Sequence, residues 1–153
     1  MKLAEALLLR SDQQKKIISL KQRINANVLV QDGDKPSEDP NELLKQVFAL
    51  IQEFQKLSYA IHETNALTKL NDGRSLLALL TLRDEFVEQH KTLTAAISNT
   101  SRESDRYSTR EIKWHKVIPV SSLQKQADDI SLKLRDLNVV IQSSNWKIDL
   151  IDA

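Results

Sequence analysis

The stretch DPNELLKQVFALIQEFQKLSYAIHETNALT, residues 39–68, decides the fold because it joins a helix start to a long apolar stripe. Asp39 suits the N-cap, Pro40 the first helical position, and Glu42 the capping-box position. Behind this start, a stripe recurs at the three- and four-residue spacing of a helix that packs against others. Its members are Leu44, Val47, Ile51, Phe54, Ser58, Ile61, Asn65 and Thr68. We therefore predict a helix over residues 41–70.

The apolar face of this helix is wider than a two-stranded coiled coil needs. Leu43, Leu50 and Leu57 lie beside the stripe and broaden it. A face of this width is typical of helices in a bundle, where more than one neighbour covers each helix.

Three other segments, near residues 2–28, 75–100 and 120–144, show the same helical period. Their inward positions are Leu3, Leu7, Ile17, Leu20, Ile24 and Val28, then Leu76, Leu79, Leu80, Phe86, Val87, Leu93 and Ile97, then Leu123, Ala127, Ile130, Leu134, Leu137, Ile141 and Ser144. Arg10 and Gln14 interrupt the first stripe. We predict a mainly α fold, a four-helix bundle of long antiparallel helices, forming a single domain over residues 1–153.

Short β-branched or alternating stretches punctuate these helices near residues 28–31, 112–118 and 146–150. Alternation of apolar and polar residues over a few positions is the pattern of a strand. We predict that the three stretches pair as a small β element at one end of the bundle.

The glycines mark turns. The chain of 153 residues has only two, and both follow an aspartate. In KLNDGRSL, Gly73 is suited to a left-handed C-terminal cap, and Ser75 can cap the next helix. A turn is favoured over a phosphate-binding loop because no strand precedes the glycine.

Composition excludes several classes of function. The chain has no cysteine, which excludes disulfides, thiolate metal sites and a cysteine nucleophile. A net charge of +1 gives no general attraction to nucleic acid or membrane. The apolar run at the N-terminus is broken by Glu5 and Arg10 and does not resemble an export signal. We expect a cytoplasmic protein without a membrane partner.

Motifs for metal or covalent chemistry are absent from the sequence. His62, His90 and His115 each lack the glutamate three positions earlier that a di-iron bundle requires. Glu85 and Glu88 form a single Glu-x-x-Glu, a pair that is common on solvated helix faces. We predict no metal and no cofactor, and the sequence leaves open whether the chain is an enzyme.

Four polar residues at apolar positions suggest a polar layer. Arg83 and His90 fall within the 75–100 stripe, while Asn65 and Thr68 extend the 41–70 stripe. Buried polar groups need partners, so these side chains are predicted to meet at one end of the bundle. The layer either specifies register and oligomeric state, which is favoured, or lines a pocket for a phosphorylated or nucleotide-like ligand.

The segment RESDRYSTREIKWHK, residues 102–116, mixes cations with aromatic rings. Side chains such as Lys113 beside Trp114 can bind phosphates and stack on bases, so nucleic-acid binding is one interpretation. Acidic residues, among them Glu111, dilute the positive charge. A structural hairpin with surface ion pairs is the favoured interpretation, and a nucleic-acid partner is not expected.

Several motifs together resemble one family of small bacterial proteins, the DIP1984-like or septicolysin-like proteins. The motifs are MKLAEALLLRSDQQKKIISLKQRI, EDPNELL, TNALTKLNDGRSL, LRDEF, DRYSTREIKWHKVIPVSSLQKQADD and NWKIDLID. The resemblance spans nearly the whole chain and implies a helical bacterial protein without an assigned catalytic role. The septicolysin-like name does not imply lysis here, because an oxygen-labile lysin depends on a thiol that this chain lacks.

The leading functional prediction is a homo-oligomeric interaction or structural protein, at least a dimer, because broad helix stripes leave apolar surface for a second copy. The alternatives are an enzyme or small-ligand binder that uses the polar layer, and a nucleic-acid binder. The candidate ligand contacts are Asn65, Thr68, Arg74, Arg83, Asp84, His90, Tyr107, Glu111, Lys113 and Trp146.

Overall fold

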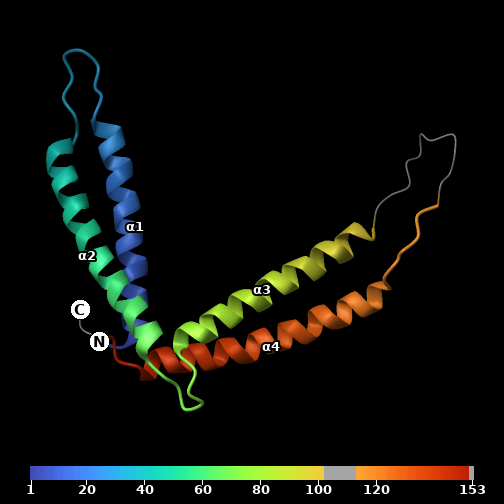
Figure 1. Cartoon of the computed structure of the whole chain (residues 1–153). Coiled ribbons are helices and arrows are strands. Elements are labelled where there is room, and N and C mark those ends of the chain that lie inside the picture. Colours follow the sequence, from blue (N-terminus) through green and yellow to red (C-terminus); the bar gives the residue numbers. More distant parts are fainter. Residues whose placement is uncertain (102–112, 152–153) are drawn as a thin grey trace. The chain divides into compact units, whose positions relative to one another are not determined.

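The chain forms four long helices, as Figure 1 shows for this computed structural model, which describes residues 1–101 and 113–151. In chain order they are α1 (Leu3–Asn27), α2 (Pro40–Leu67), α3 (Leu76–Asn99) and α4 (Val120–Lys147). The predicted mainly helical fold is confirmed, and each predicted boundary lies within three residues of the observed one.

These helices belong to two compact units. The first unit comprises Met1–Leu76 and Gln142–Ala153, and the second comprises Leu77–Ile141. The first unit contains α1 and α2, and the second contains α3 from Leu77 and α4 as far as Ile141; the end of α4 belongs to the first unit. The prediction of a single domain over residues 1–153 stays a prediction.

At the start of α2 the predicted N-cap and the position of Pro40 are confirmed, while Glu42 bonds to Lys45 instead of completing a capping box with Asp39. The Asp39 side chain accepts a hydrogen bond from the backbone N–H of Asn41 at 2.9 Å, and Pro40 occupies the first helical position. Glu42 accepts a hydrogen bond from Lys45 Nζ at 2.8 Å.

The connection from α1 back to α2 is tied down by the buried Asn27. Its Oδ1 accepts a hydrogen bond from the Glu38 N–H at 3.0 Å, and its Nδ2 donates to the Arg23 carbonyl at 2.8 Å. The Arg23 guanidinium also pairs with the Glu38 carboxylate, which lowers the pKa of Glu38. These contacts bring α2 back alongside α1.

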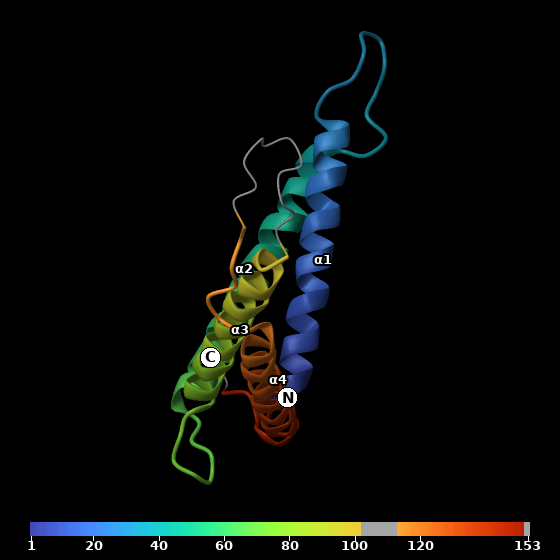
Figure 2. The same cartoon turned by 90° about the vertical axis from the view of Figure 1, so that its right-hand side faces the viewer.

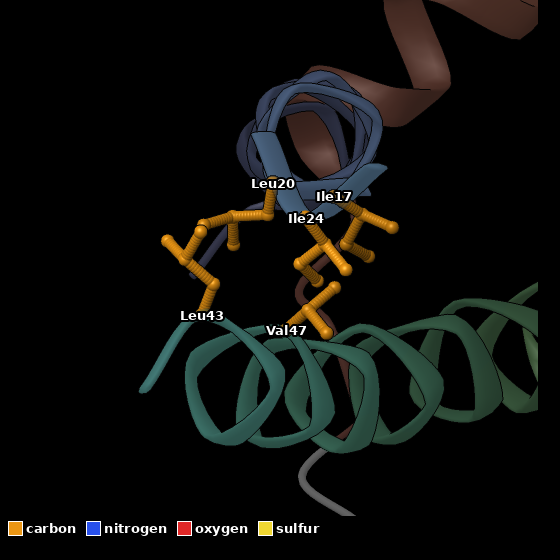
Figure 3. Close-up of a cluster of buried hydrophobic side chains, with 5 residues drawn as sticks. All are labelled: Ile17, Leu20, Ile24, Leu43 and Val47. Carbon is orange, nitrogen blue, oxygen red and sulfur yellow. The ribbon is translucent and has the colours of Figure 1, made fainter. Parts of the chain in front are cut away.

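The core of the first unit is a seam between α1 and α2. Figure 3 shows the seam side chains pointing toward one another from the two helices. The buried members are Ile17, Leu20 and Ile24 from α1 and Leu43 and Val47 from α2, with half-buried Leu44, Leu50, Ile51 and Phe54 packed against them. These positions keep the three-and-four spacing predicted from the sequence.

The seam is rotated slightly from the predicted one. Leu43 is buried where Leu44 was expected to be the inward residue, and Val28 is exposed. On α1 the polar residue in the seam is Gln13, which is 8% exposed, and not the neighbouring Gln14. The Gln13 Oε1 atom finds no hydrogen-bond partner among the described residues.

The helices of the second unit lie side by side in both views (Figures 1 and 2). Among their predicted inward residues, Leu79, Leu123, Ala127, Leu137 and Ile141 are buried. Others on the same stripes are half-buried, including Leu80, Phe86, Val87, Leu93, Ile97, Ile130 and Leu134.

The predicted small β element is wrong for the described residues, because residues 1–101 and 113–151 contain no strand. Near 28–31 the chain turns with its side chains exposed, and residues 113–118 are without strand pairing, while residue 112 lies outside the described part. Near 146–150 the helix α4 continues through Lys147, and Asp149 makes only an isolated bridge to Lys2. Short extended stretches need cross-strand partners, and these have too few.

Replacing Gln13 with leucine should stabilise the hairpin of α1 and α2. The change removes a buried acceptor without a partner and keeps a side chain of similar size, so we expect a gain of about 1 kcal/mol and a higher melting temperature. Thermal unfolding followed by circular dichroism measures this. The control is Gln14→Leu, at an exposed position, which should change the melting temperature little. A lower melting temperature for Gln13→Leu would contradict the prediction.

Candidate functional site

The two ends of the described chain meet in the first unit, at a place we call the terminal junction: residues 1–3, residues 148–151 and Thr64. The Leu3 N–H donates to the Ile148 carbonyl at 2.9 Å, and the Leu150 N–H donates to the Met1 carbonyl at 2.9 Å. Between them Lys2 and Asp149 form an isolated antiparallel bridge. The start of α1 is therefore joined directly to the residues that follow α4.

Thr64 connects this junction to α2. Its side chain is fully buried, and its Oγ1 donates to the Ala60 carbonyl at 2.7 Å. The same oxygen accepts the Ile151 N–H at 3.0 Å. One hydroxyl thus holds the C-terminal segment against α2, and Thr64 was not among the residues predicted from the sequence.

Lys2 supplies the charge at the terminal junction. Its Nζ lies 2.7 Å from Asp149 Oδ1 and donates to the Lys147 carbonyl at 3.1 Å, near the end of α4. A cation at the C-terminus of a helix satisfies carbonyls that have no partner within the helix. The Lys2 ammonium lowers the pKa of Asp149. Because both side chains are well exposed, the pair orients the chain more than it stabilises it.

The predicted polar layer is divided between the two units. Asn65 is buried near the end of α2, and Thr68 follows the last residue of that helix. Arg83 and His90 are half-buried on α3, in the second unit. The meeting of all four side chains stays a prediction.

Further buried polar side chains lie in the first unit with Asn65. Ser144 was predicted as an inward residue, whereas Gln13, Asn27, Thr64 and Asn145 were not. A signal for Thr64 was available, since it continues the three-and-four spacing of Leu43, Val47 and Ile61. Asn145 follows Ser144, the last inward position predicted for the fourth helix.

The turn that contains Gly73 is a miniature hairpin. The Leu70 N–H donates to the Arg74 carbonyl at 2.8 Å, and the Gly73 N–H donates to the Leu70 carbonyl at 2.9 Å. Gly73 has a φ of 82°, the left-handed conformation that a three-residue hairpin turn needs at this position. The expected C-terminal cap is therefore wrong: α2 ends at Leu67 with an extended Thr68, and Gly73 serves the turn five residues later.

Arg74 is engaged within this turn. Its Nε and Nη2 lie 2.8 Å and 2.7 Å from Asp72 Oδ2, and its N–H donates to Asp72 Oδ1 at 3.0 Å. These contacts lower the pKa of Asp72. A ligand anion at Arg74 would have to compete with a carboxylate already in place. On α3, Arg83 lies 3.7 Å from Asp84 in a similar local pair.

A second candidate site, the open-end cavity, lies in the second unit where α3 ends and α4 begins. It has a volume of about 470 Å³. The residues that line it are Ala96, Asn99, Thr100, Trp114, His115, Lys116, Val117, Ile118 and Leu123. Part of the predicted basic-aromatic segment therefore does line a cavity.

The remaining candidates are placed as follows. Lys113 is exposed beside the open-end cavity without lining it, and Trp146 is exposed near the end of α4. Tyr107 and Glu111 lie outside the described residues. The eight described contacts are divided between the two units, and the meeting of all ten in one site stays a prediction.

Two general properties bear on the chemistry of the described residues. Residues 1–101 and 113–151 contain no group of three or more histidine, aspartate or glutamate side chains that could hold a metal ion. No helix in this part of the chain is both long and apolar enough to cross a membrane.

Comparison with known proteins assigns the chain to a family. Residues 10–150 match a family of unknown function (DUF6847), and the chain belongs to that family. The chain is also similar to the crystal structure of a functionally unknown conserved protein from Corynebacterium diphtheriae, with 32% sequence identity, 99% of each chain covered and a TM-score of 0.90. No curated protein is significantly similar to the chain. A helical family without an assigned function is thus confirmed, and the DIP1984-like name stays a prediction.

Replacing Thr64 with valine should loosen the terminal junction. Valine matches the shape of threonine but cannot accept the Ile151 N–H, so we expect a loss of about 1–2 kcal/mol in the free energy of unfolding. Chemical denaturation measures this loss, and amide hydrogen exchange should show faster exchange at Ile151. Thr64→Ser, which keeps the hydroxyl, should protect the Ile151 amide as the wild type does. Unchanged exchange at Ile151 in the valine variant would contradict the assigned role.

Proposed function

We propose that the chain is a homo-oligomeric helical interaction protein, at least a dimer. The observation that carries this proposal is a second apolar stripe on α2, at the edge of the seam with α1: its Leu44 and Ile51 also pack against the seam, while Phe48 and Tyr59 are exposed. It consists of Leu44, Phe48, Ile51 and Tyr59 and is called the outer stripe below. Phe48 and Tyr59 are 61% and 62% exposed, while Leu44 and Ile51 are half-buried.

The outer stripe is more than scattered surface hydrophobicity. Its members recur along one side of α2, about 100° around the helix from the seam residues Leu43 and Val47. Fully burying one side chain of the size of Phe48 contributes about 1.5–3 kcal/mol. Apolar residues that recur on one face of a helix, here interrupted by Gln55 between Ile51 and Tyr59, are a common mark of a protein interface. A second helix pair laid on this stripe would complete a four-helix bundle between copies.

The proposal includes the cytoplasmic location and the structural role that were predicted from the sequence. The chain would act as a cytoplasmic structural component, with each copy contributing its helices to the assembly. The absence of cysteine and the net charge of +1 are consistent with that role. Neither the septicolysin-like name nor membrane lysis forms part of it.

Changing Phe48 to glutamate should dissociate the proposed oligomer. Burying a carboxylate in an apolar interface is costly, so we expect at least about a tenfold weaker association. Light scattering coupled to size exclusion over a micromolar range measures the mass. The control is Leu29→Glu, which alters an exposed leucine outside the helices. A wild-type mass near 17.5 kDa at every concentration would overturn the proposal.

A second candidate function, binding of a small aromatic anion, is favoured by the open-end cavity. Trp114, which is 67% exposed, lines the cavity together with Lys116 and His115, whose side chains carry cationic or hydrogen-bonding groups. An aromatic ring beside a cation is an arrangement that binds bases and phosphates. The ligand class is a nucleotide-like molecule, as the sequence suggested, but the cavity is lined by part of the basic-aromatic segment and not by the polar layer.

The test uses Trp114 as the reporter. The chain has two tryptophans, so Trp146→Phe leaves only Trp114. We expect ADP to quench its fluorescence saturably, with adenosine and inorganic phosphate each binding more weakly, because only ADP engages both ring and cation. Lys116→Gln should weaken ADP binding about fivefold or more, and Lys133→Gln, on α4 away from the cavity lining, should not.

Two outcomes would contradict this second function. Fluorescence unchanged by millimolar ADP would remove the ligand proposal. Much tighter binding of a short single-stranded oligonucleotide than of ADP would indicate a nucleic-acid binder instead.

A further inference from the structure

The charges beside the outer stripe of α2 are arranged so that the stripe is complementary to itself. Lys45 and Glu63 each come two residues after a buried residue of α2, Leu43 and Ile61. Two residues correspond to about 200° around the helix, so both charges lie away from the seam, at the same edge of the outer stripe. They stand 18 positions apart, about five turns and about 27 Å.

We propose that two copies of the chain pair through the outer stripe with their α2 helices antiparallel about a twofold axis. This inference rests on the proposed homo-oligomer and names its interface and its symmetry. In this arrangement Lys45 of each copy faces Glu63 of the other, and the contact occurs twice. The Lys45 ammonium, which lies 2.8 Å from Glu42 in its own helix, would exchange that exposed pair for Glu63. An isologous interface requires such self-complementary positions.

The apolar residues fit the same register. When Lys45 lies opposite Glu63 of the second copy, Phe48 lies opposite Tyr59 of the second copy to within one residue. The two most exposed aromatic side chains of α2 would then form two symmetric pairs, and aromatic pairs add stability beyond the area that they bury. The twofold axis passes near residue 54, so Gln55 lies nearest to it on this face and Ile51 about one turn away.

Helix geometry favours the antiparallel over the parallel arrangement. In an antiparallel pair that is related by a twofold axis, the same edge of both helices lies on one side of the interface, so Lys45 reaches Glu63. In a parallel pair the two equivalent edges lie on opposite sides of the interface. Equivalent residues of the two copies then lie at the same level along the helix axis. The parallel arrangement therefore leaves both charges without their partner across the interface.

The remaining charges on that edge do not oppose this register. Lys56 is the other charged residue there, and it would face Gln52 of the second copy. Glu53 lies away from both the seam and the interface, since it is about 160° around the helix from the centre of the outer stripe. No like charges on this edge are brought opposite each other.

Cross-linking tests the orientation directly, because the chain has no natural cysteine. Lys45→Cys and Glu63→Cys protomers are made separately and then mixed, with a short thiol-reactive cross-linker added. The antiparallel pair predicts covalent dimers in the mixture and few with either protomer alone, since two copies of position 45 would stand about 27 Å apart. Efficient cross-linking of Lys45→Cys with itself would overturn the antiparallel arrangement.

Charge reversal tests the proposed ion pairs. Lys45→Glu or Glu63→Lys alone should weaken dimerisation about fivefold at low salt, and the double variant Lys45→Glu with Glu63→Lys should restore it. The matched control is Glu53→Lys, which should leave the dimer constant unchanged. Failure of the double variant to recover would contradict the pairing.

These outcomes separate the inference from the function on which it rests. A monomeric wild type would remove both. The dimer could dissociate with Phe48→Glu and yet cross-link through identical positions, or show no response to the charge reversals. Either result would support the homo-oligomer and contradict the antiparallel pairing.

Discussion

The seam between α1 and α2 is the constraint on which the first unit depends. Ile17, Leu20 and Ile24 pack against Leu43 and Val47, and this contact sets which side of α2 is covered. One neighbouring helix can cover only part of the circumference of another. Because the apolar face of α2 is broader than that, the seam leaves the outer stripe for another partner. The location of the proposed interface is therefore a consequence of how α1 packs.

Polar contacts lie at both ends of the helix pair that the seam holds together. At one end of the pair, Asn27 ties the connecting segment back to α1 through Glu38. At the other end, the Thr64 hydroxyl joins α2 to Ile151, while Lys2 joins the chain start to Asp149. Lys2 also donates to the carbonyl of Lys147, the last residue of α4, which has no partner within its helix. Polar contacts therefore hold the chain segments at both ends of the pair formed by α1 and α2.

The family and the similar protein from Corynebacterium diphtheriae both carry no assigned function, so function is argued from surfaces. The two candidate surfaces differ in chemistry. The outer stripe is apolar with charges at one edge, which suits another copy of the chain. The open-end cavity places Trp114 beside Lys116, which suits a small aromatic anion. The two surfaces lie in different units and can be tested by independent variants.

The sequence by itself determined the number, bounds and period of the helices, because capping residues and apolar spacing act locally along the chain. It also marked both glycines as turns, and Gly73 does take a left-handed conformation. The predicted strands failed near residues 28–31 and 146–150, because strands depend on distant partners that local alternation does not supply. Only the tertiary structure decided that Gln13 enters the seam in place of Gln14, and that Thr64 receives the Ile151 amide. Such choices depend on small rotations of one helix against another and on contacts between residues far apart in the chain.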